Sequence, residues 1–217
     1  GKKNENASVL DLLDTLNIKG ALISADAMNS QKKIVEKICS ENADYVLCIK
    51  NNHKQLRDEI AAYFHKVERD NPAWIACNEQ TDSGHGRIEV RRCQQLRVSE
   101  WISEAQHWKG IRSVIKIERE RHLKDKEVST ETQYYISSLD IDPAAVNQAI
   151  RAHWEVENKV HWVLDVTFKE DDSRIRKEDG AENVGVIRRF CLNIARLHPK
   201  KASMRSKLKM AGWADEF

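Results

Sequence analysis

Long apolar runs are absent from this sequence. No stretch approaches the roughly 18 residues that a membrane-spanning helix needs, so we expect no membrane partner. The charged start has no apolar stretch behind it, so we do not expect it to be a signal peptide. The five cysteines are odd in number, widely spaced and without a C-x-x-C pair, which excludes a disulfide framework and a zinc knuckle. We therefore expect reduced thiols and a cytoplasmic protein.

Proline and glycine are also scarce, at 3 and 8 of 217 residues, and no internal repeat or low-complexity tract is present. This length indicates one large domain, or a core with an insertion. Charged residues make up 32%, yet the net charge is only +2, so the overall balance does not argue for a nucleic-acid partner. The chain begins with Gly1 instead of Met, which indicates a fragment.

The first sixty residues alternate between helical and extended patterns. Apolar residues recur at helical spacing from Val9 to Leu16. Short buried strands are predicted at 21–26 and 44–50, with an amphipathic helix over about 30–42 between them. Near-continuous apolar strands joined by a helix form a βαβ unit, so we expect two parallel strands covered by helices.

The periodicity then changes. Between residues 73 and 138 apolar side chains alternate with polar ones, which predicts antiparallel strands near 88–92, 114–119 and 133–137 and hence a β-rich insertion. Helical spacing resumes from Pro143 to about residue 164, and a further helix is predicted over 182–197. The fold class is therefore α/β with a β-rich antiparallel insertion.

Positive charge is concentrated towards the C terminus. Residues 183–214 contain no acidic side chain and eight basic ones: Arg188, Arg189, Arg196, Lys200, Lys201, Arg205, Lys207 and Lys209. This block could neutralise the phosphates of a nucleic acid. A solvated helical face explains it equally well.

One predicted helix carries polar side chains at four-residue steps. His153, Glu157, His161 and Asp165 would share one face beside an apolar stripe, as on a helix at the rim of an active site. Surface ion pairs explain the same spacing, and by spacing alone they are favoured. The H-E-x-x-H motif of zinc peptidases is absent, so we do not expect a zinc site here.

Asp26 ends the first predicted strand, where the crevice of an α/β sheet binds ligands. Alternatively, Asp26 or Ser30 caps the following helix. If Asp26 and Glu157 reach one crevice, they form a carboxylate pair suited to Mg²⁺ or Mn²⁺, which prefer oxygen ligands.

Several segments together resemble the middle block of a bacterial insertion-sequence transposase. The most specific is IRAHWEVENKVHWVLDV at 150–166, extended through 170–176 and Asn183 to the arginines at 188–189; the others are 26–32, 44–52, 85–89 and 134–138. From about residue 5 to 200 the chain is similar to the DDE transposases, the family that includes the H-repeat-associated proteins.

This resemblance implies an incomplete ribonuclease-H-like core. Residues 1–62 would form part of that core, 63–140 the insertion, and 141–217 the helical part with Glu157 and the basic tail. The family binds two metal ions, Mg²⁺ or Mn²⁺, with two Asp and one Glu, and uses them to cleave and join DNA strands. By motif, Asp26 matches the second Asp and Glu157 the Glu, while the first Asp would precede Gly1. We therefore expect the chain alone to be inactive.

The resemblance also implies DNA partners, namely transposon ends and target, and leaves a homodimer open. The candidate DNA-binding residues are Lys50, His85, Arg87, Arg151, His153, Arg188 and Arg189. His85 and Arg87 could equally serve only to shape a hairpin turn. The six tryptophans could stack on unpaired bases, although most tryptophans are packing residues. A non-catalytic DNA-binding remnant of a transposase is the alternative function, and an unrelated α/β domain is a third.

Overall fold

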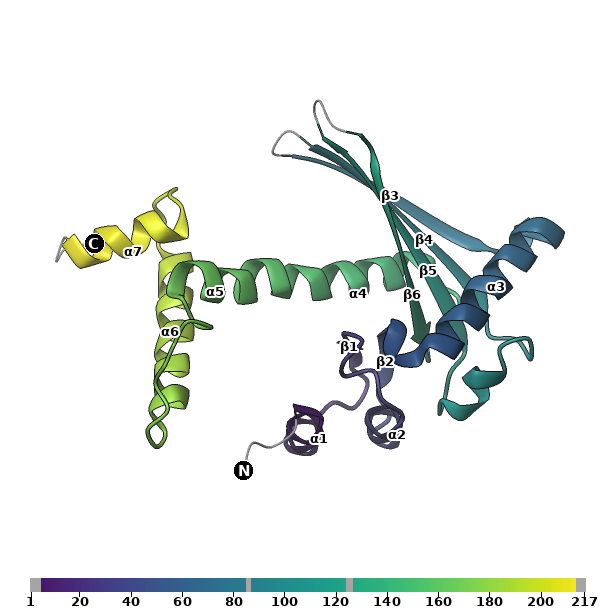
Figure 1. The fold of residues 1–217 in the computed structure, drawn as a ribbon, viewed down its shortest axis with the longest axis horizontal. Helices are drawn as coiled ribbons and strands as arrows, with labels where there is room; N and C mark the ends of the chain where they lie inside the picture. The colour runs from purple at the N-terminus through teal and green to yellow at the C-terminus, as the bar shows by residue number, and fades with distance from the viewer. Residues whose placement is uncertain (1–4, 85–86, 124–126, 214–217) are drawn as a thin grey trace. The chain divides into compact units, whose positions relative to one another are not determined.

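The computed structural model describes residues 5–84, 87–123 and 127–213, shown in Figure 1. The chain divides into two compact units, residues 1–151 and 152–217, and the boundary falls within one helix. None of the described helices is long and apolar enough to cross a membrane.

The first unit is built on one six-stranded sheet with the order β1-β2-β6-β5-β4-β3. The strands are β1 (Leu22–Ala25), β2 (Asp44–Ile49), β3 (Ala76–Gly84), β4 (Arg87–Arg97), β5 (Ser113–Leu123) and β6 (Ser129–Ser137). Its helices are α1 (Glu5–Thr15), α2 (Lys32–Ser40), α3 (Lys54–Asp70) and the start of α4 (Pro143–Val156). Short 3₁₀ turns are η1 (Asn51–His53), η2 (Pro72–Trp74) and η3 (Ser103–His107).

The predicted parallel and antiparallel parts are both confirmed, and they share one sheet. β1 and β2 are parallel, while β2 pairs antiparallel with β6 and the remaining strands continue as antiparallel neighbours. The α/β class is therefore correct. The division at residues 62 and 140 stays a prediction, and the sheet runs across it without a break.

Two elements of this unit were not predicted. α3 follows η1 directly, and its buried side chains recur at helical spacing at Leu56, Ile60, Phe64 and Val67. β3 is the edge strand beside β4, and from Asn78 to Ser83 its sequence is entirely polar. β3 is held in the sheet by its pairing with β4 and not by the burial of its own side chains. Its sequence therefore lacks the apolar alternation by which strands are predicted.

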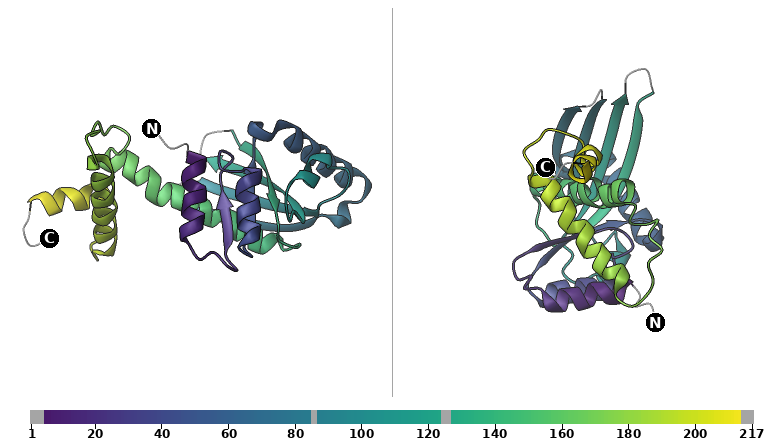
Figure 2. Two further views of the ribbon diagram at one scale, coloured as in Figure 1. Left: turned by 90° about the horizontal axis from the view of Figure 1, so that it is seen from below. Right: turned by 90° about the vertical axis from the view of Figure 1, so that its left-hand side faces the viewer.

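The main core lies between one sheet face and helices α1, α2 and α3. Alternate residues of β2, namely Tyr45, Leu47 and Ile49, face this side and are buried with Ile34 and Ile38 of α2. In Figure 2, α1 and α2 lie side by side along the β1 end of the sheet. The predicted βαβ unit therefore forms because helix and strands pack their apolar faces in one cluster. β1 lies at the edge of the sheet and is only partly buried, so the prediction of a buried strand at 21–26 is wrong.

The opposite sheet face carries the start of α4. Val146 and Ile150 of α4 are buried, and Cys93 and Ile115 are buried at alternate sheet positions that point away from the main core. Asn147 Nδ2 of α4 donates a hydrogen bond to Asn78 Oδ1 of β3 (2.9 Å). α4 is thus anchored to the sheet edge by a polar contact as well as by apolar packing.

A buried polar network turns the chain from β6 into α4, and Gln95 of β4 is at its centre. Gln95 is fully buried, and its Nε2 donates to Ser113 Oγ (2.9 Å) and to the Asp140 carbonyl (3.1 Å). Its Oε1 accepts a hydrogen bond from the Asp142 backbone N–H (2.8 Å). One amide side chain therefore satisfies several polar groups that would otherwise be buried without partners.

The second unit contains the rest of α4, a π-helical turn (Glu157–His161), α5 (Trp162–Phe168), α6 (Gly180–Leu197) and α7 (Met204–Trp213). Both predicted helical regions are confirmed, and α7 is additional. Lys207 of α7 is buried, and its Nζ donates to the carbonyls of Ala195 (2.8 Å) and His198 (2.7 Å). An ammonium group thus satisfies carbonyl groups at the C-terminal end of α6, where the helix dipole favours a cation.

We expect Gln95→Leu to destabilise the first unit by about 1–3 kcal/mol, because the Asp142 N–H and Ser113 hydroxyl lose a buried partner. Chemical denaturation measures the change. Gln106→Leu is the matched control, since Gln106 is exposed on η3. Equal stability of the two variants would contradict the proposed role of the network.

We expect Lys207→Met to destabilise the second unit by about 1.5–3 kcal/mol, because two carbonyl groups lose a charged donor. Lys209→Met removes an exposed lysine from the same helix and should change stability little. Hydrogen exchange of the last turn of α6 gives a local readout. Unchanged protection in Lys207→Met would rule out the capping role.

Candidate active site

The carboxyl ends of β1 and β2 lie at the same edge of the sheet because the two strands are parallel. Asp26 directly follows β1, and Lys50 directly follows β2. Ala25 is opposite Leu47 in the register, so Asp26 comes next to Cys48. This edge therefore carries the predicted Asp26 and Lys50 close to one another.

The pKa of the Cys48 thiol reflects both groups. Burial raises it to about 11; the positive charge of Lys50 opposes this increase, and the negative charge of Asp26 adds to it. The thiol therefore stays protonated at neutral pH, which makes it a packing residue and not a nucleophile.

Asp26 is held by its own loop. Its Oδ1 accepts hydrogen bonds from the backbone N–H and the side-chain amide of Asn29, both at 3.3 Å. Ser30 Oγ donates to the Asp26 carbonyl (2.8 Å). The N-cap of α2 is Gln31, without a side-chain capping bond, so the alternative that Asp26 or Ser30 caps α2 is wrong. The carboxylate belongs to the loop at the strand end.

Residues that follow β2 fasten this loop from the other side. Asn52 Nδ2 donates to the Ala27 carbonyl (2.5 Å), and His53 Nε2 is 2.6 Å from the Ser30 carbonyl. With the proton on Nε2, His53 donates that hydrogen bond. The sequence reasoning missed this role. The available signal was the polar run of Asn51, Asn52 and His53 at the end of a buried strand.

An open cleft of about 520 Å³ lies at this edge. It is lined by the loop after β1, the start of α2 and the turn after β2: Met28, Gln31, Lys32, Lys33, Asn52 and His53. Lys32 and Lys33 are exposed, and Lys32 Nζ is 3.9 Å from a Glu104 carboxylate oxygen. This cleft, next to the Asp26 loop, is therefore bordered by positive charge, which suits an anionic ligand; Asp26 itself is not among the residues that line it.

Glu157 begins the π-helical turn of the second unit. The predicted stripe from His153 to Asp165 assumes an uninterrupted α-helix. A π turn takes in an extra residue, so residues four apart across it no longer stack, and the expectation of one continuous stripe is wrong. Single π turns inside α-helices occur frequently at functional sites. Asp26 is in the first unit and Glu157 in the second.

Two of the predicted DNA-binding arginines form ion pairs. Arg151 binds Asp82 of β3 within the first unit. Arg189 binds Glu170 within the second unit, with Nη1 at 3.0 Å from Oε1. Both arginines thus have a structural role in addition to any contact with DNA.

The other candidates are placed as follows. Lys50 is exposed at the strand end, whereas His153 and Arg188 are partly buried in the second unit. Arg87 is the first residue of β4 and is opposite Gly84 of β3. His85 lies outside the described residues.

Metal-ligating side chains do not cluster among the residues that the structure describes: they include no group of three His, Cys, Asp or Glu that could hold one ion. At the sheet edge, Asp26 provides a carboxylate, the donor type that Mg²⁺ and Mn²⁺ prefer. It fits such an ion in its chemistry and needs further ligands to complete a site.

The comparisons with known proteins agree with one another. Residues 1–194 match the family described as transposase DDE domain. YbfL of Escherichia coli K12 is 36% identical over 215 residues, which are 97% of this chain and 57% of YbfL. YhhI of the same strain, whose name describes it as an H-repeat-associated transposase, is 36% identical over 217 residues, and the match covers 97% of this chain and 57% of YhhI.

A third relative, YncI of Escherichia coli O157:H7, also carries a transposase name and is 36% identical over 204 residues, 90% of this chain and 50% of YncI. The chain thus spans about half the length of the relatives that it matches. The match to the domain family extends over most of the sequence, from the start of the chain through most of α6. This chain therefore belongs to the DDE transposase family.

Proposed function

We propose that the chain forms part of the catalytic domain of an insertion-sequence transposase, which cleaves DNA and transfers the resulting strands. The observation that carries this proposal is Asp26. Its carboxylate is held by Asn29 at the carboxyl end of the parallel edge strand β1, and the loop that contains it borders a cleft lined by lysines. A carboxylate next to basic side chains suits the chemistry of a phosphodiester, because it can hold a cation while the lysines attract the DNA backbone.

We propose Asp26 and Glu157 as ligands of Mg²⁺ or Mn²⁺ in a ribonuclease-H-like core. Family membership and the carboxylate chemistry of both residues support this assignment. When bound, such ions stabilise the charge of a phosphoryl group in transfer. The protein's own contribution is to orient the Asp26 carboxylate, through Asn29, before any ligand arrives.

The basic residues at the strand ends would position the DNA backbone. Lys50 follows β2, while Lys32 and Lys33 border the cleft at the start of α2. Phosphate contacts of this kind fix the position of the DNA and carry no sequence information.

We further propose that the chain alone does not cleave DNA, because none of its residues matches the first Asp of the family motif. The two aspartates that precede β1, Asp11 and Asp14, lie on α1 and not at a strand end. Asp14 also forms an ion pair with Lys37 (2.6 Å). A non-catalytic DNA-binding role is the second candidate, and the basic block of the second unit favours it.

Binding of Mn²⁺ tests the role of Asp26 without depending on activity. We expect Asp26→Asn to bind Mn²⁺ at least about tenfold more weakly than the unaltered chain, since even outer partners of a metal contribute that much. Titration followed by electron paramagnetic resonance measures the affinity. Asp14→Asn is the control, because Asp14 already pairs with Lys37. If Asp26→Asn binds Mn²⁺ as the unaltered chain does, Asp26 is not a ligand.

Nicking of supercoiled DNA in Mn²⁺ tests the proposed inactivity. We expect the purified chain and Asp26→Asn to give the same background, because a carboxylate of the catalytic set is missing from both. More nicking by the chain than by Asp26→Asn would contradict the inactivity and support a site that is complete without the first Asp.

Affinity for duplex DNA at several salt concentrations tests the DNA-binding surface. We expect Lys50→Gln to weaken binding and to reduce the slope of log K against log salt by about 0.9, the value for one lost phosphate contact. Lys19→Gln is the matched control, since Lys19 is exposed before β1, at the other end of the strand. An equal effect of both substitutions would place the DNA elsewhere.

A further inference from the structure

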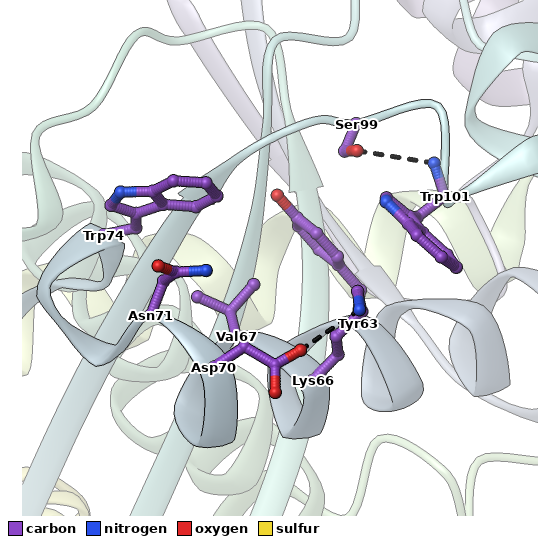
Figure 3. A pocket seen from close by; sticks show the side chains of 8 residues that line it. All are labelled: Tyr63, Lys66, Val67, Asp70, Asn71, Trp74, Ser99 and Trp101. Carbon is purple, nitrogen blue, oxygen red and sulfur yellow. Dashed lines mark hydrogen bonds and ion pairs between the residues drawn. The ribbon is translucent and has the colours of Figure 1, made fainter.

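Two tryptophans project into solvent beside a cleft of about 220 Å³ that lies apart from the Asp26 loop (Figure 3). Trp74 is 66% exposed and Trp101 is 67% exposed. In Figure 3 the ring of Tyr63 stands between them. Large aromatic side chains that are exposed close to one another form an apolar patch on the surface, and such a patch indicates a binding site.

The cleft is built by two separate segments. Tyr63, Lys66 and Val67 come from the last turns of α3, and Trp74 from η2 immediately afterwards. The chain between β4 and η3 contributes Trp101 from the other side.

Backbone hydrogen bonds hold the first of these segments. Asn71 N–H donates to the Val67 carbonyl (2.9 Å) and ends α3, and Trp74 N–H donates to the Asn71 carbonyl (3.0 Å). Trp74 is therefore positioned by the helix end and by the short turn that follows it.

The second segment is fastened to α3 by Glu59. The Glu59 carboxylate accepts hydrogen bonds from Ser103 Oγ (2.7 Å) and from the Glu104 backbone N–H (2.9 Å). Although burial opposes it, these bonds and that of Gln55 lower the pKa of Glu59, so the carboxylate is charged and the link is in place at neutral pH. Both walls of the cleft are thus anchored to the same helix and formed in advance of any ligand.

The two charged residues that line the cleft, Lys66 and Asp70, balance each other, and Arg69 lies next to Asp70 outside the lining. Lys66 Nζ lies 4.6 Å from the centroid of the Trp101 ring and 3.1 Å from Asp70 Oδ2. Arg69 Nε is 2.7 Å from the other oxygen of Asp70. The hydrogen bonds from Arg69 and Lys66 lower the pKa of Asp70 to about 2. The Asp70 carboxylate therefore forms ion pairs with two cations. Glu100 is exposed next to Trp101 in the sequence and does not line the cleft.

We propose that this cleft binds an unpaired nucleobase of DNA, with its phosphate near Lys66; the inference rests on the proposed DNA function. The Trp74 ring provides a face for stacking, which every base can use, and Trp101 stays 67% exposed although Lys66 Nζ lies over one face of its ring. Tyr63 and Asn71 provide polar groups for the edge of a base. A cationic ligand is disfavoured, because Lys66 already occupies the ring face of Trp101 and neutralises Asp70.

The base could come from a single strand of DNA or from a free nucleotide. A strand adds backbone phosphates that bind elsewhere on the protein, so its affinity should exceed that of a mononucleotide and should fall with salt. The experiment therefore compares thymidine monophosphate, a short oligothymidylate and a duplex of the same length.

The test measures fluorescence anisotropy of the labelled oligothymidylate and duplex with the whole chain, and competition by the mononucleotide. We expect Trp74→Ala and Trp101→Ala each to weaken binding of the oligothymidylate about tenfold while binding of the duplex stays unchanged. Trp74→Phe should restore most of the affinity, because a phenyl ring still stacks. Trp213→Ala is the control: Trp213 is 78% exposed, with Lys209 Nζ 5.9 Å from its ring centroid, but it lies in α7.

The outcomes separate the two proposals. If the duplex binds but neither cleft variant changes the affinity for the oligothymidylate, the cleft assignment is wrong and the DNA function stands. If Trp213→Ala causes the same loss, stacking is not specific to the cleft, and the assignment is again wrong. If the unaltered chain binds no DNA, the proposed function fails and the cleft assignment fails with it. If a proline-rich peptide binds with an affinity that depends on Trp74 and Trp101, and the oligothymidylate does not, the assignment to a nucleobase is wrong and the cleft binds a protein partner.

Discussion

The pairing of β2 with neighbours of opposite direction is the constraint on which the first unit depends. β1 lies parallel to β2 on one side, and β6 lies antiparallel on the other. Two serines at the end of β6 reinforce this second pairing: Ser137 Oγ donates to the Tyr45 carbonyl (2.7 Å), and Ser138 Oγ accepts from the Tyr45 N–H (2.9 Å). One buried strand thus joins the βαβ unit to the antiparallel strands.

The same strand explains where chemistry can occur. Parallel strands end at a common edge, so Asp26 and Lys50, which are distant in sequence, border one surface. The loop of Asp26 is then held by Asn52 and His53 from the segment after β2. A site built in this way combines a rigid sheet with loops that can take functional residues, which is the usual division of roles in α/β proteins.

The two proposed ligand surfaces of the first unit differ in character. The cleft beside Asp26 is open and bordered by lysines, which suits a phosphate backbone. The cleft between Trp74 and Trp101 is aromatic, with Lys66 and Arg69 on one carboxylate, which suits a base. Attraction between lysines and the DNA phosphate backbone gives affinity without sequence information, whereas stacking on aromatic rings selects strands whose bases are accessible. A protein that acts on DNA ends would use both properties.

Apolar periodicity predicted most of the regular structure, because the buried faces of α2, β2, β4, β5 and β6 leave a direct trace in the order of residues. It failed for β3, whose polar residues are held by pairing with β4 and by contacts with α4, and for the π turn at Glu157, which helical spacing does not signal. The block around Glu157, together with the shorter segments that include Asp26, indicated the family, and the position of Asp26 at the end of a strand was readable from sequence.

Only the tertiary structure decided what surrounds these residues. Asn52 and His53 reach the Asp26 loop, and Trp74 and Trp101 line one cleft, because folding brings together segments that lie 23 or more residues apart in the chain. Local sequence determines the propensity and the burial pattern of each segment. Which segments become neighbours is decided by how the helices and strands pack their apolar faces into one core, and no single segment contains that information.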